Sequence, residues 1–125
     1  MAEKQNKGFE NLEVWKYSIN LIKEIYLVTK NYPKEEVYGL TAQIRRSAIS
    51  IASNISEGSA KSTYAEFARF ISIALGSCAE LKCQVIISYE IGYLDVMNKN
   101  SLAEKINIIG KMLKGLERNL KGRGK

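Results

Sequence analysis

Histidine is absent from the 125 residues of this chain, and its absence removes the commonest general base and the commonest zinc ligand. It also excludes the Glu-x-x-His pairs that hold metals in ferritin-like bundles. No nucleophilic side chain has a plausible base beside it, and no carboxylate pair stands out from the other charged residues. We therefore expect a protein that is not an enzyme and that holds no metal and no cofactor.

Cysteine is nearly absent as well, with only Cys78 and Cys83 in the chain. Five residues apart on one helix, they point about 140° away from each other, so they share neither a metal nor a disulfide. We expect two buried thiols in a reducing cytosol. The opening residues, MAEKQNKGFEN, lack the apolar centre of a signal peptide, and no unbroken apolar run has the length of a membrane span. A cytoplasmic protein without a membrane partner is the prediction.

Proline occurs once, at Pro33, and alternating strand patterns are absent, so helices can continue almost unbroken. Asn11 is a candidate cap for a first helix that ends before Pro33. Residues 33–39 suit a turn or a single helical turn. A second helix covers about 41–56 and stops at Gly58, which can adopt the left-handed cap conformation.

Two further helices are indicated by pairs of residues with the spacing of a capping box. Thr63 with Glu66 predicts the start of the third helix, which ends near Gly92, and Ser101 with Glu104 predicts the start of the fourth. Four amphipathic helices with short connections predict an all-α fold, an antiparallel up-down-up-down four-helix bundle. We place this single domain at residues 9–121, between a disordered N-terminus (1–8) and a disordered basic tail (122–125).

Some apolar residues of the third helix fall outside its main seam. One core of this size does not easily hide all of them, which favours self-association, while a more crowded core is the alternative. The residues are Phe70, Ile73, Ile86, Ile87 and Ile91.

A polar row follows the apolar face of the second helix, and a similar row of Ser77, Glu80, Gln84 and Ser88 follows the third. With the two helices antiparallel about a turn near Ala60, Arg45 lies level with about Gly76, where it reaches Ser77 or Glu80. We interpret these groups as a structural network that fixes the register of the helices, and a ligand or partner site is the alternative. Its expected members are Gln43, Arg45, Arg46, Asn54, Glu57, Ser77 and Glu80.

Positive charge is in excess, because 19 lysines and arginines face 13 acidic residues, a net charge of +6. Such an excess favours nucleic acid, an anionic membrane or an acidic protein as a partner. A basic stripe runs along the fourth helix, opposite its leucine seam, and only Glu117 opposes it. Lys16, Lys23 and Lys30 on the first helix are expected to merge with it. The candidate phosphate-binding residues are Lys111, Lys114, Arg118, Lys121, Arg123 and Lys125; a face that serves solubility alone is the alternative.

The run QIRRSAISIASNISEG at 43–58, followed by Phe67, Phe70, Ala74, Gly76-Ser77 and Glu80-Leu81, resembles the four-helix bundle family of 23S rRNA intervening-sequence proteins. The pattern F-x-x-L-x-V-W-K from Phe9 and the run Tyr38-Gly39-Leu40-Thr41 match as well. The resemblance therefore covers about residues 9–120. The chain is more distantly similar to the accessory proteins of diversity-generating retroelements.

This resemblance implies a bacterial bundle that assembles into a ring-shaped homopentamer with a central channel and whose biochemical role is largely unassigned. The retroelement relatives are basic and associate with nucleic acid and a reverse transcriptase. The family pattern falls on Gln43, Arg45, Arg46, Asn54, Glu57, Gly58, Gly76, Ser77 and Glu80, none of which has a known catalytic role. We therefore expect a non-enzymatic, oligomeric, RNA-binding accessory protein. The alternative is a structural ring that docks a partner protein without contacting nucleic acid.

Overall fold

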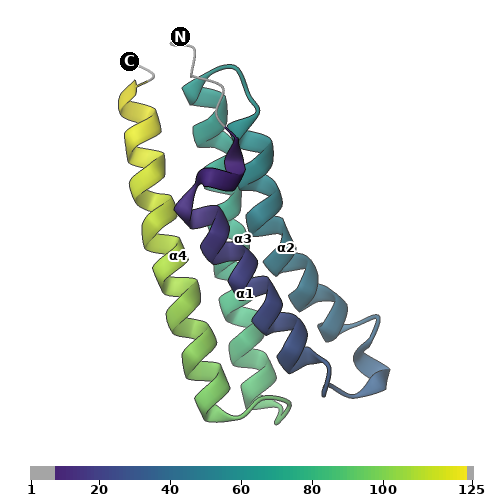
Figure 1. Cartoon of the computed structure of the whole chain (residues 1–125). Coiled ribbons are helices and arrows are strands. Elements are labelled where there is room, and N and C mark those ends of the chain that lie inside the picture. The colour runs from purple at the N-terminus through teal and green to yellow at the C-terminus, as the bar shows by residue number, and fades with distance from the viewer. Residues whose placement is uncertain (1–7, 124–125) are drawn as a thin grey trace.

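The computed structural model describes residues 8–123, and in this range every regular element is a helix. Four long helices lie side by side, and each runs antiparallel to the one before it (Figure 1). The predicted four-helix bundle is confirmed. The elements are η1 (Phe9–Asn11), α1 (Glu13–Thr29), η2 (Lys34–Glu36), α2 (Leu40–Ser59), α3 (Tyr64–Glu90) and α4 (Val96–Arg123).

The core consists of the apolar seams that the helical period predicts. Each helix turns one stripe inward, at spacings of three and four residues, so that large aliphatic side chains from all four meet along the bundle axis. Each such side chain contributes about 2 kcal/mol by leaving water. The most deeply buried include Leu21 and Ile25 of α1, Ile44, Ile51 and Ile55 of α2, Ile71 and Leu81 of α3, and Leu102, Ile109 and Leu113 of α4.

The first helix begins differently from the prediction, because Asn11 does not cap it. Asn11 is the last residue of the short helix η1, and α1 begins at Glu13. The cap residue of α1 is Leu12, whose side chain makes no capping hydrogen bond. The ring of Phe9 packs edge-on against Trp15 with centroids 5.0 Å apart. This contact accompanies η1, the turn of 3-10 helix that ends at Asn11, one residue before the cap residue Leu12. The single helical turn predicted within 33–39 is present as η2.

Gly58 is also used differently from the prediction. The second helix continues through it to Ser59, and Gly92 is the one described glycine with positive φ. A Cβ at residue 58 would lie 2.8 Å from both Phe67 Cδ1 and Phe70 Cβ. Gly58 therefore allows α2 and α3 to approach closely. Phe70, which lies outside the main seam of α3 as expected, is buried by this close approach.

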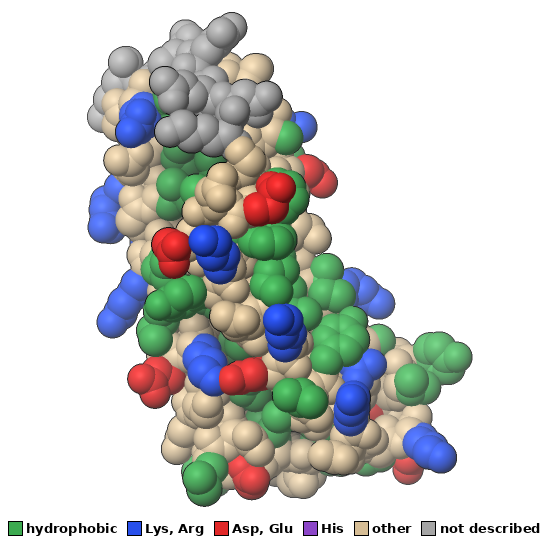
Figure 2. Space-filling model, in the orientation of Figure 1, with side chains coloured by type: hydrophobic (Ala, Val, Ile, Leu, Met, Phe, Trp, Pro, Cys, Tyr) green, Lys and Arg blue, Asp and Glu red, His purple; other side chains and the backbone are tan. Residues whose placement is uncertain are grey.

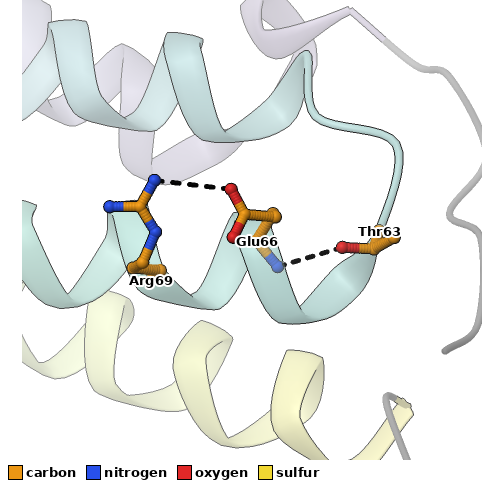
Figure 3. A network of polar contacts seen from close by, with 3 residues as sticks. All are labelled: Thr63, Glu66 and Arg69. Carbon is orange, nitrogen blue, oxygen red and sulfur yellow. Dashed lines mark hydrogen bonds and ion pairs between the residues drawn. The ribbon is translucent and has the colours of Figure 1, made fainter.

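Thr63 starts the third helix as predicted. Its Oγ1 accepts a hydrogen bond from the Glu66 backbone N–H at 3.1 Å, while the Glu66 carboxylate pairs with Arg69 at 3.4 Å (Figure 3). The cap is therefore made by Thr63 alone, since the Glu66 side chain turns forward along the helix. Gly92 ends α3 with φ of 87°, in the conformation that glycine adopts most readily.

The fourth helix starts at Val96 and not at Ser101. The Asp95 carboxylate accepts a hydrogen bond from the Asn98 backbone N–H at 2.7 Å, which satisfies one of the free donors at the start of a helix. The sequence prediction, which started this helix at Ser101, did not include this cap. Helix α4 also continues through Gly122 and Arg123, so the expected irregular tail at 122–125 is wrong for those two residues. Residues 1–7 and 124–125 lie outside the described range.

Candidate nucleic-acid interface

The basic stripe is defined here as Lys111, Lys114, Arg118 and Lys121, which are all exposed on the outer side of α4. Figure 2 shows basic side chains protruding along the outer edge of this helix. Lys121 Nζ lies 3.7 Å from Glu117 Oε2, one helical turn away, in a pair whose lysine is exposed and whose carboxylate is partly buried. The other three cations form no ion pair with a described carboxylate. Seven residues before Lys111, the exposed Glu104 ends the stripe.

Arg123 lies apart from the stripe. It follows Lys121 by two residues, which is about 200° around a helix. Its guanidinium packs over the Tyr64 ring, 5.4 Å from the centroid, and its Nε donates to Asn119 Oδ1 at 2.8 Å. Arg123 therefore covers the start of α3 and does not lengthen the row of cations. Lys125 lies outside the described residues.

The basic residues of α1 do not merge with the stripe, which corrects the prediction. Lys105 marks the side of α4 that meets α1, because it forms an ion pair with Glu24 of that helix. The stripe lies about 120° to 180° away from Lys105 around α4. Over α1 and its seam with α4, acidic and basic side chains alternate (Figure 2), including the Lys16–Glu13 pair at 3.6 Å. The stripe faces away from this mixed surface.

Lys82 of α3 joins the stripe at its other border and is not among the residues predicted for it. Its Nζ donates to Asn107 Oδ1 at 3.0 Å, and Asn107 lies one helical turn before Lys111. Because Lys82 and Lys111 come from antiparallel helices, their proximity depends on the packing of α3 against α4. The feature that could have pointed to Lys82 is its position on the flank of α3 that borders α4.

The polar network between α2 and α3 exists, with a membership that differs from the expected one. Ser47 Oγ donates to Glu80 Oε1 at 2.7 Å, and the hydroxyls of Ser50 and Ser77 lie 2.9 Å apart. Asn54 Nδ2 donates to the Ser50 carbonyl at 2.8 Å and to its hydroxyl at 3.0 Å. The expected members Asn54, Ser77 and Glu80 therefore take part, together with Ser47 and Ser50. The side chains of Gln43, Arg46 and Glu57 are exposed and bond to no other described side chain.

Arg45 faces α1 and not α3, so its expected contact with Ser77 or Glu80 is wrong. The pairing of Ser47 with Glu80 places Arg45 level with about Lys82, roughly six residues from the expected Gly76. Its Nε donates to Thr29 Oγ1 at 2.9 Å, and its guanidinium lies 4.4 Å from the centroid of the Tyr26 ring. The residue connects α2 to the end of α1.

The two thiols differ in their surroundings. Cys78 is buried in the core, and this burial raises its pKa to about 11. Cys83 is exposed, contrary to the prediction that both are buried. Both are free, as their separation around the helix predicts. Within the described range, no group of three His, Cys, Asp or Glu residues is arranged to hold a metal ion.

Helix α3 is the one described helix that is long and apolar enough to cross a membrane, although no unbroken apolar run in it has that length. Nearly half of that stretch is buried inside the bundle. Its buried side carries the seam from Phe67 to Val85, which packs against the other helices. Length and apolar composition are what the central helix of a bundle requires, so they are weak evidence for a membrane span.

Comparison with known proteins gives one family and one fold. The model of the family described as 23S rRNA-intervening sequence protein matches residues 10–115. No curated protein matches the chain. A crystal structure of a protein of unknown function from the S23 ribosomal protein family of Bacteroides thetaiotaomicron is similar in fold, with a TM-score of 0.75 at 22% identity. The similarity covers 83% of this chain and 97% of that one.

Proposed function

This chain belongs to the family of 23S rRNA-intervening sequence proteins, and on that basis we propose that it is a non-enzymatic, oligomeric accessory protein of the bacterial cytoplasm that binds nucleic acid, RNA above all. The binding surface is the basic stripe of α4. The protein works without metal or cofactor, and its partners are further copies of itself, nucleic acid and, by analogy with the retroelement accessory proteins, a protein such as a reverse transcriptase.

The observation that carries the proposal is the row of exposed cations without acidic partners at Lys111, Lys114 and Arg118. With Lys121 they extend over about 15 Å of helix, since each residue adds 1.5 Å. A row of this kind can contact successive phosphates of one strand, and each contact releases condensed counterions. Charge paired within the protein would contribute less, so the lack of nearby carboxylates matters more than the net charge.

Self-association is supported by the apolar residues that the bundle leaves exposed. Ile87 and Ile91, exposed by 43% and 51%, lie one helical turn apart at the end of α3, and Ile73, exposed by 43%, lies on the same side beyond the polar residues Ser77 and Glu80. Exposed large apolar side chains are typical of a contact between subunits when they gather on one surface. Each added subunit brings a further +6 to the assembly, which strengthens any attraction to phosphates.

A salt-dependent titration tests the proposal. Fluorescence anisotropy with a structured RNA hairpin should give an affinity that falls by about two to three log units for each tenfold rise in salt, if three phosphates are engaged. The variant Lys114→Glu/Arg118→Glu/Lys121→Glu should lose this binding. Binding that is undetectable at low salt, or unchanged in this variant, would overturn the proposal.

A matched control separates the stripe from net charge. Lys16→Glu/Lys23→Glu/Arg46→Glu changes the charge by the same amount at exposed positions of α1 and α2. We expect this variant to keep most of the affinity, because these three positions lie outside the stripe. Equal losses in the two variants would mean that total charge and not the stripe decides binding.

The second candidate function, a ring that docks a partner protein without touching nucleic acid, is favoured by the same exposed isoleucines. Affinity capture from a native lysate distinguishes the two. A stoichiometric protein that remains bound after nuclease treatment, together with no RNA binding at low salt, supports the scaffold. Capture that nuclease abolishes supports the accessory role.

A further inference from the structure

A surface pocket of about 470 Å³ lies at the end of the bundle where α1 ends and the chain turns through η2 into α2 (lower right in Figure 1). Three cations line it, one from the end of α1, one from η2 and one from α2: Lys30, Lys34 and Arg45. Two threonines, Thr29 and Thr41, line it as well. Figure 2 shows basic side chains gathered over this corner of the molecule.

The charge of this pocket is uncompensated. Its lining contains no acidic residue, and none of its three cations forms an ion pair with a described carboxylate. The nearest acidic residues along the chain are on η2. Glu36 is already engaged, since its carboxylate accepts hydrogen bonds from the Leu40 backbone N–H at 3.1 Å and from the Tyr93 hydroxyl at 2.9 Å. Glu35 is exposed and lies outside the lining.

Arg45 is held in place by contacts that leave most of its donors free. Its Nε bonds to Thr29 Oγ1 and its plane lies over the Tyr26 ring, whereas its two terminal nitrogens bond to no other described residue. One of five guanidinium donors is therefore used. A guanidinium fixed in orientation, partly buried and without a carboxylate is preorganised to receive an anion in two parallel hydrogen bonds.

Thr41 adds a second feature of a binding site. It lines the pocket from the second position of α2, and its hydroxyl bonds to no other described residue. In this pocket, beside three cations and near the positive end of a helix, the partner that fits is an oxygen atom of an anion.

We propose that this pocket binds a phosphate group, carried by a mononucleotide or by the end of a nucleic acid strand. Arg45 and Thr41 would hold the phosphate oxygens, and Lys30 and Lys34 would close over them from the exposed side. The volume exceeds what a phosphate needs and lies in the range of small-molecule sites. Pro33 and Val37 supply an apolar wall for a sugar or a base. This site is separate from the stripe of α4 and does not depend on it.

Calorimetric titration at constant ionic strength tests the proposal with five probes: adenosine 5′-monophosphate, adenosine, inorganic phosphate, and one oligonucleotide in two forms, with a 5′-phosphate and with a 5′-hydroxyl. Adenosine 5′-monophosphate should bind and adenosine should not. Equal binding of inorganic phosphate identifies a free anion as a sufficient ligand, and a preference for the 5′-phosphorylated oligonucleotide identifies a strand end. No binding of any phosphate probe up to about 10 mM, or equal binding of adenosine, would overturn it.

Three variants locate the site. Arg45→Gln should weaken binding by about tenfold or more, and Lys34→Gln by a few fold, as expected for losing a charge-assisted hydrogen bond or a nearby charge. Lys34 is exposed, so its variant remains informative if Arg45→Gln loosens the bundle. Arg46→Gln removes the same charge from the next residue, outside the pocket, and should bind like the wild type. An equal loss in Arg46→Gln, or no loss in Lys34→Gln and Arg45→Gln, contradicts the proposal.

Discussion

The backbone of Gly58 in α2 lies so close to Phe70 in α3 that a Cβ at residue 58 would sit 2.8 Å from the Phe70 Cβ. The Phe67 Cδ1 atom, one helical turn earlier on α3, is equally near. Glycine inside a helix ordinarily costs about 1 kcal/mol relative to alanine. Here it is the residue that lets the two helices close at their connected ends.

Gly58→Ala is therefore expected to destabilise the protein by about 2 kcal/mol, because overpacking outweighs the gain in helix propensity. Gly110→Ala is the matched control, since its Cβ would meet nothing within 4 Å. That variant should gain about 0.5 to 1 kcal/mol. Urea unfolding measures both, and stabilisation by Gly58→Ala would contradict the close approach of α2 and α3.

Asp95→Ala should cost about 1 kcal/mol of stability, because it removes the acceptor of the Asn98 N–H at the start of α4. Ser101→Ala should change stability by less than about 0.5 kcal/mol, since Ser101 is an exposed position within the helix. The comparison, made by thermal or urea unfolding, reports where α4 begins. A larger loss of stability for Ser101→Ala would indicate that α4 is capped by the pair at 101 and 104 and not by Asp95.

Gln84→Met should stabilise the bundle by about 1 kcal/mol. Gln84 is 8% exposed, and its Oε1 is buried without a hydrogen-bond partner among the described residues. Methionine keeps the length of the side chain and removes that unsatisfied oxygen. Gln43→Met, at an exposed position of α2, is the control and should have little effect. Destabilisation by Gln84→Met would indicate that the amide has a partner in the assembled protein.

The pH dependence of stability should report the buried thiol of Cys78. Because folding raises its pKa from 9.0 to about 11, the folded state keeps a proton that the unfolded chain loses. Stability from this group is complete below about pH 9 and falls by roughly 2 kcal/mol as pH rises to about 11. Burial also raises the pKa of Tyr32, which adds a loss in the same direction at higher pH.

Comparison of Cys83→Ala with Cys78→Ala/Cys83→Ala isolates the thiol. The single variant should keep the decline above pH 9, and the double variant should lose part of it, in unfolding curves measured from pH 7 to pH 11. Parallel declines in the two would assign the effect to other groups. The exposed Cys83 is removed from both because its reactivity would disturb unfolding under these conditions.

The candidate site shows where inference from the sequence stops. The outward position of Lys111, Lys114 and Arg118 follows from their spacing on one helix, and the structure agrees with it. The predicted merger of the basic residues of α1 with the stripe is wrong. It depends on which flank of α4 meets α1, and Lys105 occupies that flank. The contribution of Lys82 does not follow from spacing along one helix, since it depends on the register between α3 and α4.

The sequence by itself determined that the chain forms four amphipathic helices, which residues fill their shared core, and that Thr63 and Gly92 bound the third helix. These are properties of neighbours within one or two helical turns, where apolar period and capping act. Only the tertiary structure decided that Ser47 meets Glu80, that Arg45 turns toward Thr29, and that Gly58 admits Phe70. An offset of a few residues between two helices changes every contact across them, and no local pattern carries that offset.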